Sequence, residues 1–221
     1  MPQRLRPSAP VAAAAVLVGD PGRALMLAQE LLEEPKMSNH ARGLWGYTGR
    51  RPQGGELTIQ ATGMGGPSAA LVVADLAKLG VRRAVRVGTC AGFPGGARSG
   101  ELVLVSGAIS AGGSSAAFGV ETGGSALPDP ELLEDLRAEL GDEARVAEVA
   151  SLDAMPPAGA DGPGAAADMQ TVAVLARSGE LGLAAAAVLV VSEETGGAGR
   201  LEDERLEAAT KRAGAAAAAV L

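Results

Sequence analysis

The stretch "RAVRVGTCAG", residues 83–92, joins an apolar strand pattern to a glycine-rich turn. Ala84, Val85 and Val87 are typical of a strand covered on both faces, as in α/β proteins. Arg86 interrupts this apolar run, and burying an unpaired guanidinium is costly. The Gly-Thr pair that follows offers a hydroxyl and close backbone approach. We therefore expect Arg86 to share an anionic ligand with this turn.

Further strand-like runs alternate with helix-like segments on both sides of this stretch. The strand-like runs are residues 13–19, 56–63, 101–109, 145–151 and 185–192. We expect helices over residues 23–34, 67–79, 129–140, 166–177 and 201–221. This order predicts an α/β sandwich. The Gly/Ala/Pro-rich stretches 110–128 and 155–167 lack periodicity and are interpreted as loops.

Length and composition narrow the class of protein. The 221 residues, 47% of them hydrophobic, predict a single domain spanning residues 1–221. A net charge of −7, without a basic stripe, argues against a nucleic-acid partner. One cysteine favours a reducing compartment, and one His with one Cys gives no ligand cluster, so we expect no metal.

The N-terminus has a feature of a secretory signal. Arg4 and Arg6 precede the apolar run "VAAAAVLVG" at 11–19. This run ends in a turn without a cleavage region, and about 20 apolar residues are needed to span a bilayer. We therefore expect no membrane segment and a cytoplasmic location.

Three glycine-rich turns follow apolar strands. They are "GDPGRA" at 19–24, "TGMGGPSAA" at 62–70 and "GTCAG" at 88–92. Backbone N–H groups at such turns converge on whatever lies in front of them, which favours an anion. The middle turn resembles a dinucleotide fingerprint, but Ser68 stands where its third small residue belongs, and no acidic residue ends a second strand about 20 residues later. We interpret it as a different anion site.

Three arginines lie at or near these turns. Arg23 follows the first turn, Arg86 precedes the third, and Arg42 lies in the polar segment "SNHARG". Three guanidinium groups can meet one tetrahedral oxyanion, and phosphate fits that description. For Arg86 alone, an ion pair with a nearby carboxylate is an equally good interpretation.

Several segments together resemble a known family. They are "VLVGDPGRA", "NHARGLWGYTG", "TGMGGPSAA", "VRVGTCAG", "SGELVLVSGAI", "ADMQ" and "VVS", in this order. The chain resembles the purine nucleoside phosphorylase and uridine phosphorylase family, specifically up to about residue 110 and more loosely beyond. The resemblance implies a three-layer sandwich with a central mixed β-sheet flanked by helices, and a hexamer built from homodimers.

The implied reaction is phosphorolysis of a purine nucleoside to free base and (deoxy)ribose 1-phosphate, a step of nucleotide salvage. Inorganic phosphate is the co-substrate, and no cofactor is expected. The resemblance assigns phosphate to Gly19, Arg23, Arg86 and Thr89, with Arg42 contributed across the dimer interface. A bound phosphate would also stabilise the oxocarbenium-like transition state.

The resemblance also assigns the nucleoside site. Its residues are Met64, Cys90, Ala91, Gly92, Met155, Asp168, Met169, Gln170 and Glu193. Gln170 stands where the family's "EMEA" motif has the carboxylate that binds the ribose hydroxyl groups, so charge assistance of order 1 kcal/mol is lost. Glu193 and Arg86 are the predicted catalytic residues, with Glu193 as general acid to the leaving base. A solvated Glu193-Glu194 pair is the alternative interpretation.

The second half departs from the family pattern. Met155 stands where family members carry an aromatic residue against the base, and the pyrimidine-reading Gln-Arg pair is missing. Gln3 lies nearest the place of the family's N-terminal histidine, and we expect His40 to be a surface or interface residue. The missing Gln-Arg pair argues against uridine and favours purine nucleosides, whereas the lost aromatic residue and the missing histidine are features expected of a catalytically weakened member. Uridine phosphorylase and a catalytically weakened nucleoside- or phosphate-binding member stay as alternatives.

Overall fold

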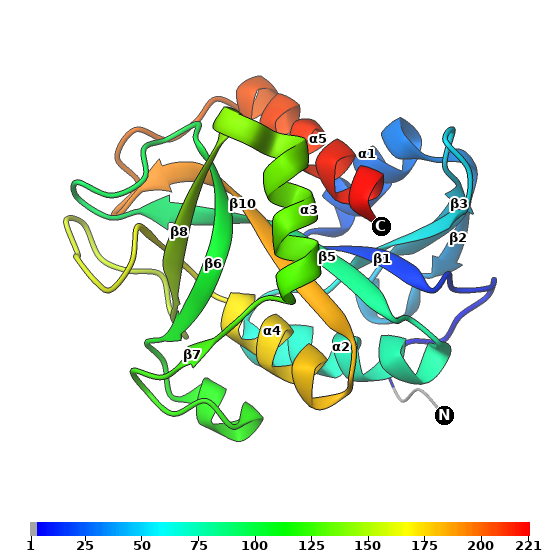
Figure 1. Cartoon of the computed structure of the whole chain (residues 1–221), viewed down its shortest axis with the longest axis horizontal. Coiled ribbons are helices and arrows are strands. Elements are labelled where there is room, and N and C mark those ends of the chain that lie inside the picture. Colours follow the sequence, from blue (N-terminus) through cyan, green and yellow to red (C-terminus); the bar gives the residue numbers. More distant parts are fainter. Residues whose placement is uncertain (1–3) are drawn as a thin grey trace.

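The computed structural model describes residues 4–221, and one mixed sheet runs through them (Figure 1). Its strands are β1 (Ala14–Val18), β2 (Glu33–Asn39), β3 (Gly46–Arg50), β4 (Glu56–Ala61), β5 (Arg83–Gly92), β6 (Leu102–Ser110), β7 (Ser125–Ala126), β8 (Ala144–Ser151), β9 (Ala166–Asp168) and β10 (Ala184–Glu194). The strand order is β10-β6-β8-β9-β5-β1-β4-β3-β2, with β7 beside β6. Because β10 also pairs with β5, the strands from β5 to β10 in this order close on one another.

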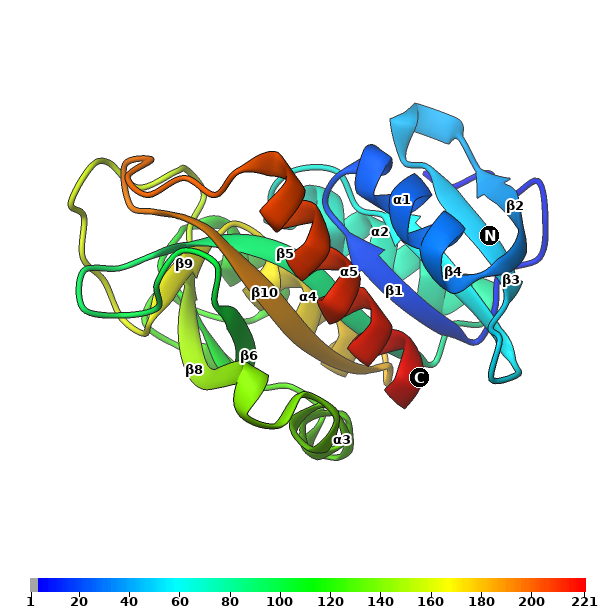
Figure 2. The same ribbon diagram turned by 90° about the horizontal axis from the view of Figure 1, so that it is seen from above.

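Helices cover both faces of the sheet, which confirms the predicted three-layer α/β sandwich (Figures 1 and 2). One face carries α1 (Pro21–Leu31), α3 (Pro130–Leu140) and α5 (Asp203–Val220) over one apolar cluster. The other face carries α2 (Gly66–Leu79) and α4 (Thr171–Glu180) over a second cluster. Short 3-10 helices η1 (Ala41–Gly43), η2 (Ser114–Phe118) and η3 (Gly141–Glu143) lie in the connections.

Local sequence explains where the main helices begin. The Asp20 side chain accepts a hydrogen bond from the backbone N–H of Arg23 at 2.9 Å, and Pro21 occupies the first turn of α1. Asp129 caps α3 in the same way, through the N–H of Leu132. Gly65 precedes α2 with φ of 79°, a left-handed conformation that favours glycine.

Two predicted helices were wrong at one end. The helix expected over 23–34 ends at Leu31, because the chain turns at Leu32 and Glu33 starts β2. The helix expected over 166–177 begins only at Thr171, since Ala166–Asp168 forms β9 between β5 and β8. The predicted loop 110–128 also contains η2 and β7.

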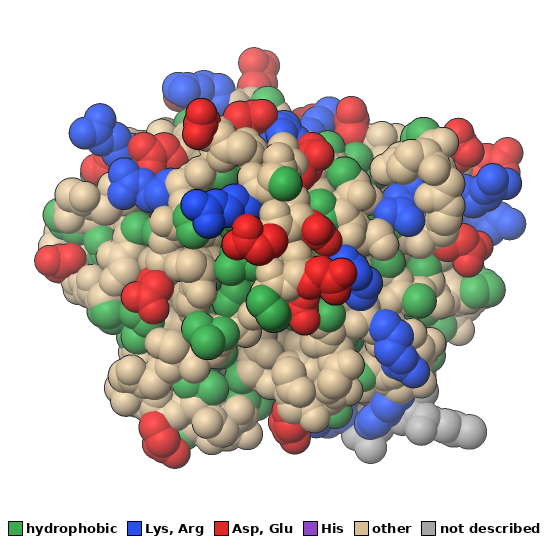
Figure 3. Space-filling view, in the orientation of Figure 1, with side chains coloured by type: hydrophobic (Ala, Val, Ile, Leu, Met, Phe, Trp, Pro, Cys, Tyr) green, Lys and Arg blue, Asp and Glu red, His purple; other side chains and the backbone are tan. Residues whose placement is uncertain are grey.

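The surface carries charges of both signs. On the face drawn in Figure 3, Lys and Arg side chains are interspersed with Asp and Glu side chains. Arg83, for example, lies 3.4 Å from Asp135 of α3. Within residues 4–221, no helix combines the length and the apolar character that crossing a membrane requires.

Candidate active site

A pocket of about 370 Å³ lies at the carboxyl ends of the parallel strands β1, β4, β5 and β10. In the sheet, β1 lies between β4 and β5. The chain runs from β1 through β2 and β3 to β4 on one side of β1, and then crosses to β5 on the other side. Such a change of side is the switch point where α/β sheets bind ligands. The sequence-predicted residues that line the pocket are Gly19, Arg23, Met64, Arg86, Thr89, Cys90, Ala91, Met155, Asp168, Met169 and Gln170. Segments far apart in the chain therefore meet in one place.

Three helices begin at this pocket. Pro21 at the start of α1, Gly65 before α2 and Gln170 before α4 all contribute to its lining. The N-terminus of a helix carries partial positive charge and unpaired N–H groups. The backbone alone therefore makes the pocket favourable for an anion.

Arg23 and Arg86 bring two positive charges to the same pocket. Burial lowers the pKa of the Arg23 guanidinium, the charge of Asp20 opposes this shift, and the nearby charge of Arg86 adds to it. Among the residues that the structure describes, Arg23 forms no salt bridge. Two neighbouring guanidinium groups with only partial neutralisation are suited to a multiply charged oxyanion.

Arg86 is anchored inside the protein and is only 4% exposed. Its Nη2 donates to Oδ2 of Asp168 at 2.9 Å, its Nη1 donates to Oε1 of Gln170 at 2.7 Å, and its Nε donates to Oγ1 of Thr171 at 3.2 Å. A guanidinium has about five N–H donors, so one remains on Nη1 and one on Nη2. Arg86 is thus paired with a carboxylate, as the alternative interpretation expected, and it also lines the pocket. Its predicted role as a ligand of a bound anion stays a prediction.

Asp168 is saturated by donors from the protein. Its fully buried carboxylate accepts hydrogen bonds from Arg86, from the hydroxyls of Ser151 (2.5 Å) and Thr171 (2.7 Å), and from the N–H groups of Gln170 (3.1 Å) and Thr171 (3.0 Å). These bonds fix the start of α4 and hold the guanidinium in place. Little capacity is left for a sugar hydroxyl, so Asp168 serves as an anchor within the site.

The side-chain amide of Gln170 is held in one orientation by one hydrogen-bond donor and one hydrogen-bond acceptor. Its Oε1 faces the donor-only guanidinium of Arg86, and its Nε2 donates to the backbone oxygen of Gly63 at 2.5 Å. Because the oxygen of Gly63 can only accept, this position suits an amide and disfavours a second carboxylate oxygen. One N–H of Nε2 remains available, so Gln170 offers the pocket a donor.

Cys90 forms a neutral part of the pocket wall. Burial, together with the nearby charge of Asp168, raises the pKa of its thiol far above the ordinary range. The thiol lies 3.7 Å from the backbone oxygen of Val190, to which it donates. Cys90 is therefore protonated at neutral pH and is not a nucleophile.

Three predicted site residues do not line the pocket: Arg42, Gly92 and Glu193. Arg42 is exposed in η1, with φ of 60°. Gly92 packs against the backbone of Ala97 so closely that a Cβ would collide with its oxygen, which gives this glycine a structural role. Gln3 lies outside the described residues.

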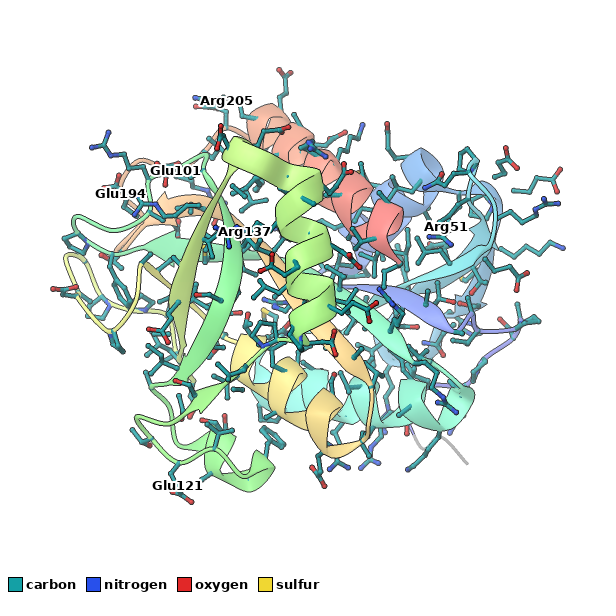
Figure 4. All side chains as sticks on the ribbon, viewed as in Figure 1. Arg51, Glu101, Glu121, Arg137, Glu194 and Arg205 are labelled. Atoms are coloured by element: carbon teal, nitrogen blue, oxygen red, sulfur yellow. The ribbon has the colours of Figure 1, made fainter. Side chains whose placement is uncertain are left out.

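Glu193 is displaced by an irregularity in β10. The pairing of β10 with β5 shifts register between Val191 and Glu193, and Ser192 lines the pocket instead. Glu193 is half-buried beside it, and Glu194 lies near Glu101 at the same end of the sheet (Figure 4). The "VVS" ending of the strand is the sequence signal that could have indicated Ser192. Within residues 4–221, no cluster of His, Cys, Asp or Glu side chains could hold a metal ion.

Comparison with known proteins gives a consistent picture. The family model described as "Phosphorylase superfamily" matches residues 13–163. The "Purine nucleoside phosphorylase DeoD-type" of Oceanobacillus iheyensis is 40% identical over 94 residues, which are 42% of this chain and 40% of that protein. The protein of the same description from Caldanaerobacter subterraneus subsp. tengcongensis is 42% identical over 81 residues, 36% of this chain and 34% of that protein. The matched part thus spans at most about two fifths of these curated relatives.

Proposed function

This chain belongs to the phosphorylase superfamily, and from that premise we propose that it is a pentosyltransferase acting on purine nucleosides. The reaction uses inorganic phosphate and yields free base and (deoxy)ribose 1-phosphate. The observation that carries the proposal is the meeting of Arg23 and Arg86 in one pocket at three helix N-termini. The description of the relatives as purine nucleoside phosphorylases supports the choice of substrate.

Phosphate binds at the end of the pocket that holds the arginines. The free N–H donors of Arg86, the guanidinium of Arg23 and the hydroxyl of Thr89 are the groups available to its oxygens. A phosphate oxygen attacks the anomeric carbon, a carbon–oxygen bond forms, and the bond to the base nitrogen breaks. Fixing the anion beside the sugar lowers the barrier by orientation and by stabilising the oxocarbenium-like transition state.

The sugar lies over the Met64, Met169 and Gln170 part of the lining. Gln170 donates its remaining N–H to a sugar oxygen, in place of the carboxylate that the family motif carries. Met64 is 90% exposed and supplies an apolar surface at the mouth of the pocket.

The leaving base takes a proton from Glu193 in this proposal. This carboxyl lies next to Ser192 and outside the lining, so protonation requires its side chain to rotate toward the base. Glu193→Gln should lower kcat for nucleosides with poor leaving groups and leave the phosphate KM within about twofold. An unchanged kcat would remove Glu193 from the mechanism.

Arg42 completes the phosphate site of a neighbouring copy in the proposed homodimer. Its exposure, and its absence from the lining of its own pocket, are what a shared site requires. Arg42→Ala should raise the phosphate KM, whereas sedimentation of a fully active 21.8 kDa monomer would contradict sharing.

The direct test is release of free base from inosine, adenosine, guanosine and uridine, with and without phosphate. We expect phosphate-dependent release from the purine nucleosides. Arg23→Ala should raise the phosphate KM and lower kcat/KM by about 100-fold, and Arg50→Ala, an exposed arginine outside the pocket, is the matched control. Release without phosphate, or binding without turnover, would contradict the proposal.

A further inference from the structure

A second cavity adjoins the first at Met155, and we propose that it is a subsite for an apolar alkyl or aryl substituent on the leaving base. This inference rests on the proposed function and narrows its substrate class. The cavity measures about 480 Å³ and lies under the loop that connects β8 to β9. Its volume falls within the range of small-molecule sites.

The two cavities share one floor. Ala91 of β5 pairs with Ala167 of β9, and Ala167 pairs with Ala150 of β8, so these three side chains form a row on one face of the sheet. Ala91 and Ala167 line the first pocket, whereas Ala150 lines the second. Phe93, just after the end of β5, packs with Ala150 and Ala167 and also lines the second cavity. Neighbouring residues of one sheet face therefore line the two cavities.

Met155 is the divider between them. It lines both cavities, and the residue is 60% exposed, so core packing does not hold it in place. An unbranched thioether changes rotamer easily and contacts aromatic or aliphatic groups well. A substituent reaching from the first pocket can therefore displace Met155 or pack against it.

The direction of the substrate follows from the position of the arginines. Arg86 and Ala91 are on the same strand, and the Arg86 guanidinium lies beside Gly88, three residues and roughly 10 Å of strand before Ala91. If phosphate binds at the arginine end, the leaving base is directed toward Ala91 and Met155. The second cavity then accommodates a substituent on the edge of the base that is farthest from the sugar.

Most residues in the walls of the cavity are apolar. Leu152, Pro156, Pro157 and Pro163 contribute to the lining, and prolines restrict the conformations of a loop. Phe93 is buried at the floor, where it can contact an aryl ring. The second cavity is therefore suited to bind an apolar group through van der Waals contacts and burial of apolar surface.

The carboxylates at the rim have other partners. Asp153 accepts hydrogen bonds from the N–H groups of Gly113 (2.7 Å) and Ser114 (3.0 Å). Asp161 is exposed and accepts from the N–H of Gly162 at 2.8 Å. Neither carboxylate is positioned as a free counter-ion inside the second cavity. The cavity therefore favours a neutral substituent over a cationic one.

The test compares adenosine with N6-benzyladenosine in phosphorolysis. The wild-type protein should use both with kcat/KM values within about tenfold of each other, since the benzyl group is accommodated. Ala160→Phe fills the cavity and should lower kcat/KM for N6-benzyladenosine by about tenfold or more, with adenosine within twofold of wild type. Ala117→Phe, at an exposed position outside both cavities, is the matched control.

A nucleoside with its aryl group on the sugar, 5′-deoxy-5′-(phenylthio)adenosine, separates the two ends of the substrate. Its kcat/KM should not respond to Ala160→Phe, and a loss equal to that of the benzyl substrate would overturn the placement of the base. A wild-type kcat/KM for N6-benzyladenosine more than 100-fold below that for adenosine would also overturn it.

Failure of the proposed function has a different signature. In that case adenosine itself is not cleaved, and the subsite is tested by calorimetric binding of adenine and N6-benzyladenine. The benzyl derivative should bind wild type at least tenfold more tightly than adenine, and Ala160→Phe should abolish the difference. Equal affinities for wild type would refute the subsite independently of catalysis.

Discussion

Replacing Asp168 by Asn should destabilise the fold and leave the Arg86 charge without its buried partner. The two side chains are 0% and 5% exposed, and 2.9 Å separates Oδ2 from Nη2. Breaking a buried pair by removing one member costs about 3–5 kcal/mol. The asparagine NH2 group would also face donors, because the N–H groups of Gln170 and Thr171 point at the carboxylate oxygens. For a chain of this length, the loss corresponds to a fall in Tm of about 6–20 °C.

Urea and thermal unfolding of wild type and Asp168→Asn measure this difference. Asp161→Asn is the matched control, since Asp161 is exposed and, within residues 4–221, its carboxylate accepts only from its neighbour's N–H. Phosphate should raise the Tm of Asp168→Asn by more than it raises that of wild type, because the anion replaces the missing counter-charge on Arg86. A free energy of unfolding within 1 kcal/mol of wild type would refute the role of Asp168 as anchor.

Three further predictions address other groups of the protein. Gly88→Ala places a Cβ 2.5 Å from Nη2 and 2.6 Å from Cζ of Arg86, so the guanidinium must move; phosphate affinity, measured by calorimetry, should fall by about tenfold or more. Cys90 should react with a disulfide reagent at pH 8 only over hours in the native protein and at once in denaturant, because burial raises the pKa of its thiol. Hydrogen bonds from Ser114 lower the pKa of Asp153 in the folded state, so its contribution to stability is present at neutral pH and is lost below about pH 4; Asp153→Asn should reduce the fall in Tm between about pH 5 and pH 3.

Each of these three predictions can be contradicted by a specific measurement. Gly179→Ala is the control for Gly88→Ala, because a Cβ at Gly179 meets no atom within 4 Å, and equal phosphate affinity of the two variants would contradict displacement of the guanidinium. Rapid native labelling of Cys90 would show that the thiol is accessible and ionised. If the Tm of wild type and of Asp153→Asn fell equally between about pH 5 and pH 3, Asp153 would not contribute to the loss of stability in acid.

The periodicity of the sequence predicted the α/β sandwich, whereas the resemblance to a known family supplied most of the residues that line the pocket. Continuous apolar runs identified β1 and β5, and the turns after them contain Gly19, Arg23 and Thr89. These residues were expected to meet because turn N–H groups and guanidinium groups can share one oxyanion. In the structure they line one pocket at the carboxyl ends of parallel strands.

The remaining features depend on contacts between distant parts of the chain. Arg86 and Asp168 are 82 residues apart in sequence, and no local pattern distinguishes their pairing from two independent ligands of a substrate. The strand Ala166–Asp168 is too short to show a period, so it was assigned to a helix. The position of Ser192 depends on a register shift near Glu193, which sequence alternation does not report.

The three helix N-termini at the pocket have a consequence for the kinetics of encounter. The chain as a whole carries a net charge of −7, so a phosphate ion is repelled at long range and held only at close range, by amide groups and two arginines. At about 0.1 M salt, the repulsion is largely screened beyond about 10 Å, whereas the short bonds inside the pocket are screened much less. Moderate ionic strength should therefore speed the arrival of the anion and leave its departure nearly unchanged.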